Sequence, residues 1–164
     1  MCRPNALSKV RLVHDPLPPW RVGSGWGITR ETRLVLFLIT ATTLVRFGFG
    51  WALGLGVDES YTVAAGRTLR LGYFDHPPAA WWMQWTAAHL LGTEAPIAVR
   101  LPFILTFALS TWLMYRLGAA IADYRAGLWA AVALNLSPVF SVTTGTWVLP
   151  DGPLDCALLG ARRT

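Results

Sequence analysis

Long apolar runs separated by short polar segments dominate this chain of 164 residues. The first run covers residues 34–55, and two more cover residues 99–118 and about 127–148, the last with a kink expected at Pro138. Each has about the 20 residues that an α-helix needs to cross a hydrocarbon layer of about 30 Å. A fourth apolar stretch, residues 79–91, is shorter, and its three tryptophans favour an interfacial or re-entrant helix. The pattern predicts an all-α membrane protein with about three transmembrane helices.

The polar segments complete the predicted organisation. Residues 1–33 are basic and rich in helix breakers, which predicts a disordered cytoplasmic leader. Residues 57–97 form the first loop, in which the spacing predicts an amphipathic helix over residues 60–71 that ends at Gly72. The last residues, 156–164, are too few for a fourth span and are interpreted as a truncated tail.

Composition supports a membrane protein and argues against nucleic-acid binding. Charged residues make up 14% of the chain, against about 25% in soluble domains. Nine tryptophans are many for this length, and tryptophan concentrates at membrane interfaces. The net charge is +5, but the basic residues flank apolar runs and form no dense cluster of the kind that nucleic acid requires. Cys2 and Cys156 lack metal-ligand spacing and are interpreted as unrelated thiols.

Segment lengths decide which polar sites share one face of the membrane. The basic leader places the N-terminus in the cytoplasm by the positive-inside rule. If residues 79–91 do not cross, the motifs at Asp58, Asp75 and Asp151 all lie on the extracytoplasmic side. If that stretch crosses, Asp151 moves to the cytoplasm, away from Asp58. The short length of the stretch favours the first arrangement.

Arg46 lies within the first apolar run, where a charge near the bilayer centre costs at least about 2.5 kcal/mol. We expect its side chain either to snorkel to the interface or to face other helices. The alternative is a supporting residue that binds an anionic, lipid-linked group.

Four short motifs occur in order along residues 34–155. They are Asp58-Glu59-Ser60-Tyr61, Gly72-Tyr73-Phe74-Asp75-His76-Pro77-Pro78, Val99-Arg100-Leu101-Pro102 and Pro150-Asp151-Gly152-Pro153-Leu154. The set resembles integral-membrane glycosyltransferases of the GT-C class, in the bacterial branch that contains dolichyl-phosphate-mannose-type, aminoarabinose and Rgt-type transferases. The resemblance implies sugar transfer from a polyprenyl-phosphate donor at the extracytoplasmic face of the bacterial inner (plasma) membrane. Proteins of that class have more spans, so the chain is expected to represent an N-terminal part.

The acidic motifs supply the candidate chemistry. The resemblance makes Asp58, and with it Glu59, the catalytic candidates, because transfer to a hydroxyl or amine needs a general base. Asp58, Asp75 and Asp151 are also candidate ligands of a divalent cation that would balance the donor phosphate. The alternative roles are structural: a helix N-cap for Asp58, and turn residues for Asp75 and Asp151.

Further polar residues are candidates for binding the donor phosphate or the acceptor. Arginine offers a forked pair of donors to phosphate, and the remaining candidates have oxygen or imidazole groups. Solvated, turn-forming or headgroup-contacting roles are the alternative. The candidates are Tyr61, Arg67, Asp75, His76, Arg100 and Asp151.

Two other classes of function remain open at this point. A small non-enzymatic membrane protein, such as a transporter subunit or an assembly factor, would be equally hydrophobic, and an inactive truncated product is a third interpretation. The non-enzymatic interpretation does not account for three acidic motifs on one face. The expected partners are membrane lipids and the polyprenyl-phosphate sugar, with no nucleic acid; the pattern indicates no oligomeric state, sugar or acceptor.

Overall fold

The computed structural model describes residues 29–73 and 76–161, apart from the side chains of Thr143 and Thr144. Within these residues the chain is helical, with no strand. Most of the predicted leader, together with Asp75 and the last three residues, lies outside the described residues. Residues 30–33, which were assigned to the leader, belong instead to the first helix.

Two helices are long and apolar enough to cross a membrane among the residues described: α1, Arg30–Ala52, and α4, Pro96–Ile121. Each reaches a mean hydropathy of 1.7 over its best window. They correspond to the predicted spans at residues 34–55 and 99–118. α1 begins where the Thr29 side chain accepts a hydrogen bond from the Thr32 backbone N–H. The Thr32 hydroxyl also lies 2.8 Å from the Tyr115 hydroxyl, which ties α1 to α4.

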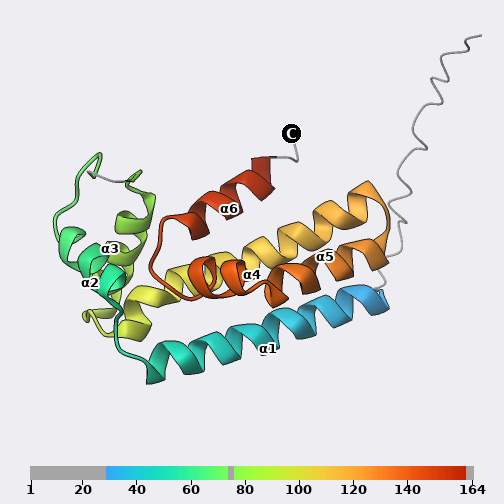
Figure 1. Ribbon diagram of the computed structural model, residues 1–164, viewed down its shortest axis with the longest axis horizontal. Coiled ribbons are helices and arrows are strands. Elements are labelled where there is room, and N and C mark those ends of the chain that lie inside the picture. The colour runs from blue at the N-terminus through green and yellow to red at the C-terminus, as the bar shows by residue number, and fades with distance from the viewer. Residues whose placement is uncertain (1–28, 74–75, 162–164) are drawn as a thin grey trace, which may run out of the picture.

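The third predicted span, residues 127–148, is not one continuous helix. It divides into α5, Tyr124–Leu136, and a π-helix, η1, Val139–Thr144. Ser137 has a ψ of 117°, outside the α region, because the proline that follows it at position 138 clashes with a helical conformation there. The interruption lies at Pro138, where a kink was expected, but it divides the predicted span into two helices instead of bending one. α5 and η1 together run back along α4 (Figure 1).

The three short helices are α2, Val57–Ala65, α3, Ala79–Leu91, and α6, Asp151–Ala161. α3 has the bounds expected for the interfacial stretch. The helix predicted over residues 60–71 was misplaced: α2 begins three residues earlier and ends at Gly66. Gly66 is the C-cap of α2, before the Gly72 that was expected to stop the helix. A Cβ atom at Gly66 would lie 1.9 Å from Gln84 Nε2, so the end of α2 is packed closely against α3.

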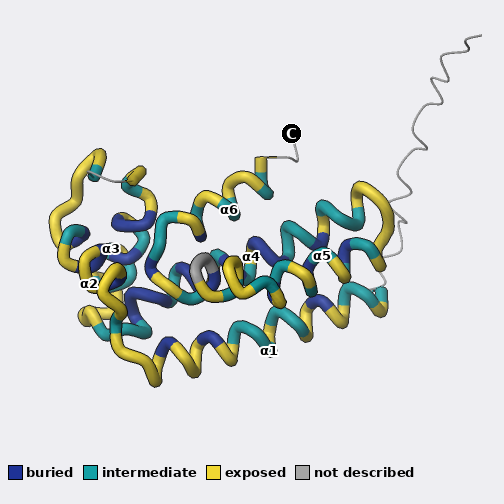
Figure 2. The backbone as a smooth tube through the Cα atoms, in the orientation of Figure 1, coloured by how far each residue is buried: buried dark blue, intermediate teal, exposed yellow. Residues whose placement is uncertain are grey.

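The helices form a bundle with a cap at one end. α1, α4 and α5 lie side by side, with α6 against α4 (Figure 1). α2 and α3 sit where α1 ends and α4 begins, and the turn between α4 and α5 lies at the opposite end (Figure 1). α1 buries few of its residues, and side chains such as Phe37 and Trp51 are 72% and 76% exposed (Figure 2). Such an exposed apolar helix fits contact with lipid.

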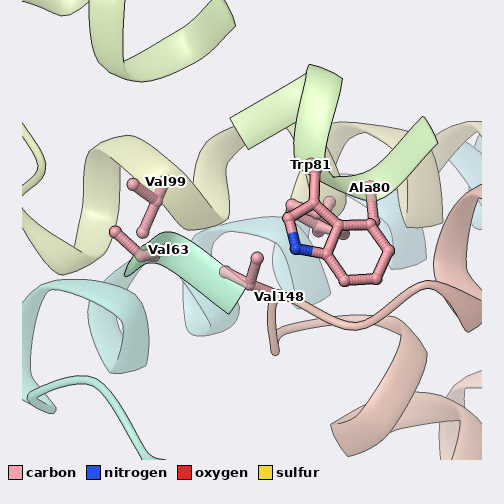
Figure 3. Packing of buried hydrophobic residues seen from close by; sticks show 6 residues of the cluster. Val63, Ala80, Trp81, Val99 and Val148 are labelled. Atoms are coloured by element: carbon pink, nitrogen blue, oxygen red, sulfur yellow. The ribbon is translucent and has the colours of Figure 1, made fainter. Parts of the chain in front are cut away.

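Two apolar clusters hold this arrangement together. One joins α1, α4 and α5 through Val35, Tyr115 and Ala131. The other lies at the capped end, where Figure 3 shows Trp81 beside Ala80 and the valines at positions 63, 99 and 148. The second cluster contains residues from α2, α3, α4 and the segment that follows η1, so it fixes the surroundings of the candidate site.

α4 and α5 cross closely because two glycines face each other. A Cβ atom on Gly127 would lie 2.5 Å from the Tyr115 carbonyl oxygen, and one on Gly118 would lie 2.8 Å from the Gly127 Cα. Small residues of this kind allow membrane helices to approach closely and to pack without a hydrophobic driving force. The crossing sets the return path of the chain toward the capped end.

Candidate active site at the capped end of the bundle

A buried ion pair between Glu59 of α2 and Arg100 of α4 forms the centre of the capped end. The two side chains are 2% and 3% exposed. Arg100 Nε donates to Glu59 Oε1 at 2.8 Å, and an Arg100 Nη2 hydrogen donates to Glu59 Oε2 at 2.5 Å. This forked geometry matches the two donors of a guanidinium to the two oxygens of a carboxylate. The pair therefore clamps the start of α2 onto α4.

Arg100 also closes the end of α1. Its remaining N–H groups donate to the carbonyl oxygens of Gly50, Leu53 and Gly54, at 3.4, 2.8 and 2.8 Å. The last carbonyls of a helix lack partners within the helix, so a cation is favourable there. With the two bonds to Glu59, all five N–H groups of the guanidinium are used. Arg100 is thus a structural cation, and the predicted contact with a donor phosphate does not fit this geometry.

Both carboxylate oxygens of Glu59 are likewise used in contacts within the protein. Beyond Arg100, its oxygens accept hydrogen bonds from the backbone N–H of Gly56 at 2.9 Å and of Val148 at 3.2 Å. Burial by itself would raise the pKa of this carboxyl, but the hydrogen bonds from Arg100 and from the two backbone groups outweigh it and hold the pKa below its ordinary value. These contacts favour a structural role for Glu59 over the catalytic role considered from the sequence.

The bond from Val148 brings distant segments together. Val148 follows η1, and its backbone N–H reaches a carboxylate on α2, 89 residues away in the sequence. Its side chain lies in the same apolar cluster as Val63 and Trp81 (Figure 3). The chain therefore returns to the capped end after α5, as an arrangement without a crossing at residues 79–91 requires.

Asp58 is the exposed neighbour of this buried pair. It lies in the first turn of α2, whose N-cap is Gly56, so the N-cap role considered for Asp58 does not apply. Consecutive residues of a helix project about 100° apart, which turns Asp58 outward while Glu59 points inward. Within the described part of the chain no group hydrogen-bonds to the Asp58 carboxylate. The Asp58 carboxylate is thus accessible to a substrate, on a helix that the neighbouring Glu59–Arg100 pair holds in place.

The other candidates are spread around the cap. Arg67 donates to both carboxylate oxygens of Glu94, at 3.0 and 2.7 Å. These hydrogen bonds raise the pKa of Arg67 and lower that of Glu94. Both side chains are exposed, and because exposed ion pairs contribute little, Arg67 can exchange Glu94 for another anion. Tyr61 and His76 are exposed as well, and the His76 ring lies 6.2 Å from that of Trp81.

A pocket of about 230 Å³ opens between α2 and α3 beside Arg67. The buried amide of Gln84 and the stacked rings of Trp85 and His89, 3.9 Å apart, form part of its wall. Gln84 also donates to the Thr62 carbonyl oxygen at 2.9 Å, which joins α3 to α2. Gln84 and Glu94 could not be identified from the sequence, because neither belongs to a short motif and only the tertiary contacts place them beside Arg67.

Asp151 begins α6 and is exposed. One helical turn later lies Asp155, which was not predicted as a site residue. Burial, and then the charge of Asp151, raise the pKa of Asp155. The spacing of four residues between Asp151, in the Pro-Asp-Gly-Pro motif, and Asp155 is the signal that could have identified this pair. In the part of the chain that the structure describes, no group of three potential metal ligands occurs. Asp75, the third predicted metal ligand, lies outside that part.

Comparison with known families adds the decisive observation. A family model described as dolichyl-phosphate-mannose-protein mannosyltransferase matches residues 75–161, more than half of the chain. The chain belongs to this family. No curated protein and no solved structure matches the chain. Membership identifies the chain with membrane glycosyltransferases of the GT-C type, and it confirms the resemblance drawn from the four motifs.

The family match contains Arg100 and Asp151 but begins after Asp58. The evidence for Asp58 is therefore its motif together with its place in the structure. That place is an exposed position beside a buried ion pair, one end of which lies in the matched region.

Proposed function

We propose that the chain transfers a sugar from a polyprenyl-phosphate donor to a lipid, glycan or protein acceptor at the extracytoplasmic face of the bacterial inner membrane. Family membership supports glycosyl transfer within a membrane. The observation that carries the proposal is the placement of Asp58, an exposed carboxylate held by the buried Glu59–Arg100 pair at the mouth of an apolar bundle. A lipid-linked donor can place its phosphate at the capped end of the bundle, near Asp58, while its polyprenyl chain stays in the bilayer.

In the proposed mechanism, Asp58 acts as the general base. It accepts the proton of the acceptor hydroxyl or amine as that group attacks the anomeric carbon of the donor. The bond from that carbon to the phosphate oxygen breaks, and the polyprenyl phosphate leaves. Arg67 is the available cation for the phosphate, because its exposed partner Glu94 can be displaced. A divalent cation bound by Asp58 and Asp151 would balance the same negative charge.

The donor class provides the direct test of the proposed function. Membranes that contain the protein are given radiolabelled sugar either on polyprenyl phosphate or on a nucleotide. Incorporation into an endogenous acceptor is expected from the polyprenyl-phosphate sugar alone. Incorporation from the nucleotide sugar in membranes depleted of lipid-linked sugar would contradict the proposal. No incorporation from either donor would favour a non-enzymatic membrane protein.

The proposed topology places the cap outside the cell and the turn between α4 and α5 in the cytoplasm. Arg116 and Arg125 flank that turn, in agreement with the positive-inside rule. In spheroplasts, a membrane-impermeant maleimide is expected to label a cysteine placed at Ser60 directly. A cysteine placed at Tyr124 should react only after permeabilisation. The reverse pattern, or direct labelling at both positions, would contradict this topology.

A further inference from the structure

Arg46 is a buried cation inside the first membrane helix. It lies six residues before the end of α1 and is 6% exposed. The ion pairs among the described residues join other arginines, so no described carboxylate compensates this charge. The expectation that Arg46 faces other helices is thereby confirmed, and snorkelling is excluded. A guanidinium keeps its charge in a protein interior, so its neutral contacts define what it does.

Those contacts lie on both sides of the break at Pro138. An Arg46 Nη2 hydrogen donates to Asn135 Oδ1 in α5 at 3.3 Å, and Nη2 also donates to Ser141 Oγ in η1 at 3.0 Å. The guanidinium carbon lies 4.2 Å from the centre of the Phe107 ring in α4. Asn135 is itself held, because its amide donates to Thr111 Oγ1 at 3.1 Å. One side chain of α1 therefore bridges α5 and the π-helix.

The end of η1 is packed directly against Arg46. A Cβ atom on Gly145 would lie 2.8 Å from Arg46 Nε and 2.6 Å from the Ser141 carbonyl oxygen. Arg46 Nε has no hydrogen-bond partner among the described residues, so the glycine backbone meets it by contact alone. π-Helical turns are rare and are frequent at functional sites. Here the Arg46 guanidinium holds the π-helical turn through its hydrogen bond to Ser141 and its contact with Gly145.

The turn leads straight to the candidate active site. Three residues after Gly145, the Val148 N–H donates to Glu59, and three residues later Asp151 begins α6. The segment 145–151 is thus anchored at one end by Arg46 and in its middle by Glu59. We propose that Arg46 is a positioning residue, which fixes segment 145–151, and with it Asp151, relative to α2. That this positioning serves sugar transfer rests on the proposed function, whereas the positioning itself does not.

A purely stabilising role would be served better by an apolar residue. Arginine in a membrane helix opposes insertion, and apolar replacements of buried charges are often neutral or stabilising. What an apolar side chain cannot do is donate hydrogen bonds to α5 and η1 at the same time. The arrangement therefore predicts that Arg46→Met loses the order of segment 145–151 without a loss of bundle stability.

Spin-label distances test this directly and do not depend on transfer activity. In a background with Cys2 and Cys156 replaced by Ser, one pair of labels is placed at Leu90 of α3 and Leu154 of α6, which are 81% and 56% exposed. A second pair, at Leu44 and Ile121, reports on α1 and α4 alone. In Arg46→Met the distance distribution of the first pair is expected to broaden to about twice its original width, because the segment is released into several local states. The second pair should not change.

Arg46→Lys keeps a donor and a charge, and it is expected to give a narrower first distribution than Arg46→Met. Arg116→Met removes an exposed arginine from the far end of α4 and should leave both pairs unchanged. An unchanged first pair in Arg46→Met would overturn the inference. Broadening of both pairs would also overturn it, because Arg46 would then hold the whole bundle. If Arg46→Met does not fold, Arg46→Gln is measured by the same criteria.

Discussion

Asp58→Asn is expected to reduce sugar transfer from the polyprenyl-phosphate donor by about 10²–10⁴-fold, the range lost with a general base. Asparagine has nearly the same shape but cannot take a proton, and it binds a divalent cation less well than a carboxylate does. The substitution should leave α2 intact, because the Asp58 carbonyl, not its side chain, accepts the hydrogen bond from Thr62. Initial rates in membranes, normalised to the amount of folded protein, measure the effect.

The same substitution at the opposite end of the bundle is the matched control. Asp123 caps α5 by accepting a hydrogen bond from the Ala126 N–H at 2.7 Å, and asparagine caps a helix as well as aspartate does. Asp123→Asn should therefore transfer sugar at the parental rate. Asp58→Glu, which keeps a carboxylate on a longer arm, is expected to retain part of the activity. Parental transfer by Asp58→Asn would remove Asp58 from the mechanism while leaving the donor test of the function unaffected.

Arg100→Met is expected to cost about 3–5 kcal/mol of unfolding free energy at pH 7, because it leaves a buried carboxylate without its cation. It also removes the hydrogen bonds that Arg100 donates to the last carbonyls of α1. Replacing both partners, in Glu59→Met with Arg100→Met, should recover much of the loss, since two apolar side chains leave no buried charge. Helicity measured by circular dichroism during denaturation in mixed micelles gives the free energies.

The stability that depends on Glu59 should change with pH in opposite directions in the parent protein and in Arg100→Met. In the parent protein the pKa of Glu59 is held below its ordinary value of 4.5, so the stability it contributes is present above that pH. It is lost as the pH falls through the lower folded value. In Arg100→Met, burial without a cation raises the pKa of Glu59, and the neutral form is favoured. The loss of unfolding free energy in Arg100→Met, relative to the parent protein, should therefore shrink as the pH falls from 7 toward 4.5. A loss that grows over that interval, or no loss at pH 7, would contradict the role assigned to the pair.

The two carboxylates at positions 58 and 59 show where reasoning from a motif stops. The acidic pair after an apolar run could be identified in the sequence, but one residue of the pair is buried and the other exposed. Which of them is available for chemistry depends on the helical phase of α2 and on Arg100, 41 residues further along the chain. Neither can be derived from the spacing of the motif, because a short helix can present either residue to its neighbours.

The sequence by itself determined the features that depend on local length and composition. Apolar length predicted α1 and α4, the short tryptophan-rich stretch predicted α3 with its bounds, and Pro138 marked the break after α5. Tertiary structure decided the rest: the end of α2 at Gly66, the division of the third span, and the commitment of Arg100 to Glu59. A membrane requires about 20 apolar residues whatever surrounds them, so length can be read from one segment. The partner of a buried charge is chosen by packing between distant segments, and so it follows only from the folded chain.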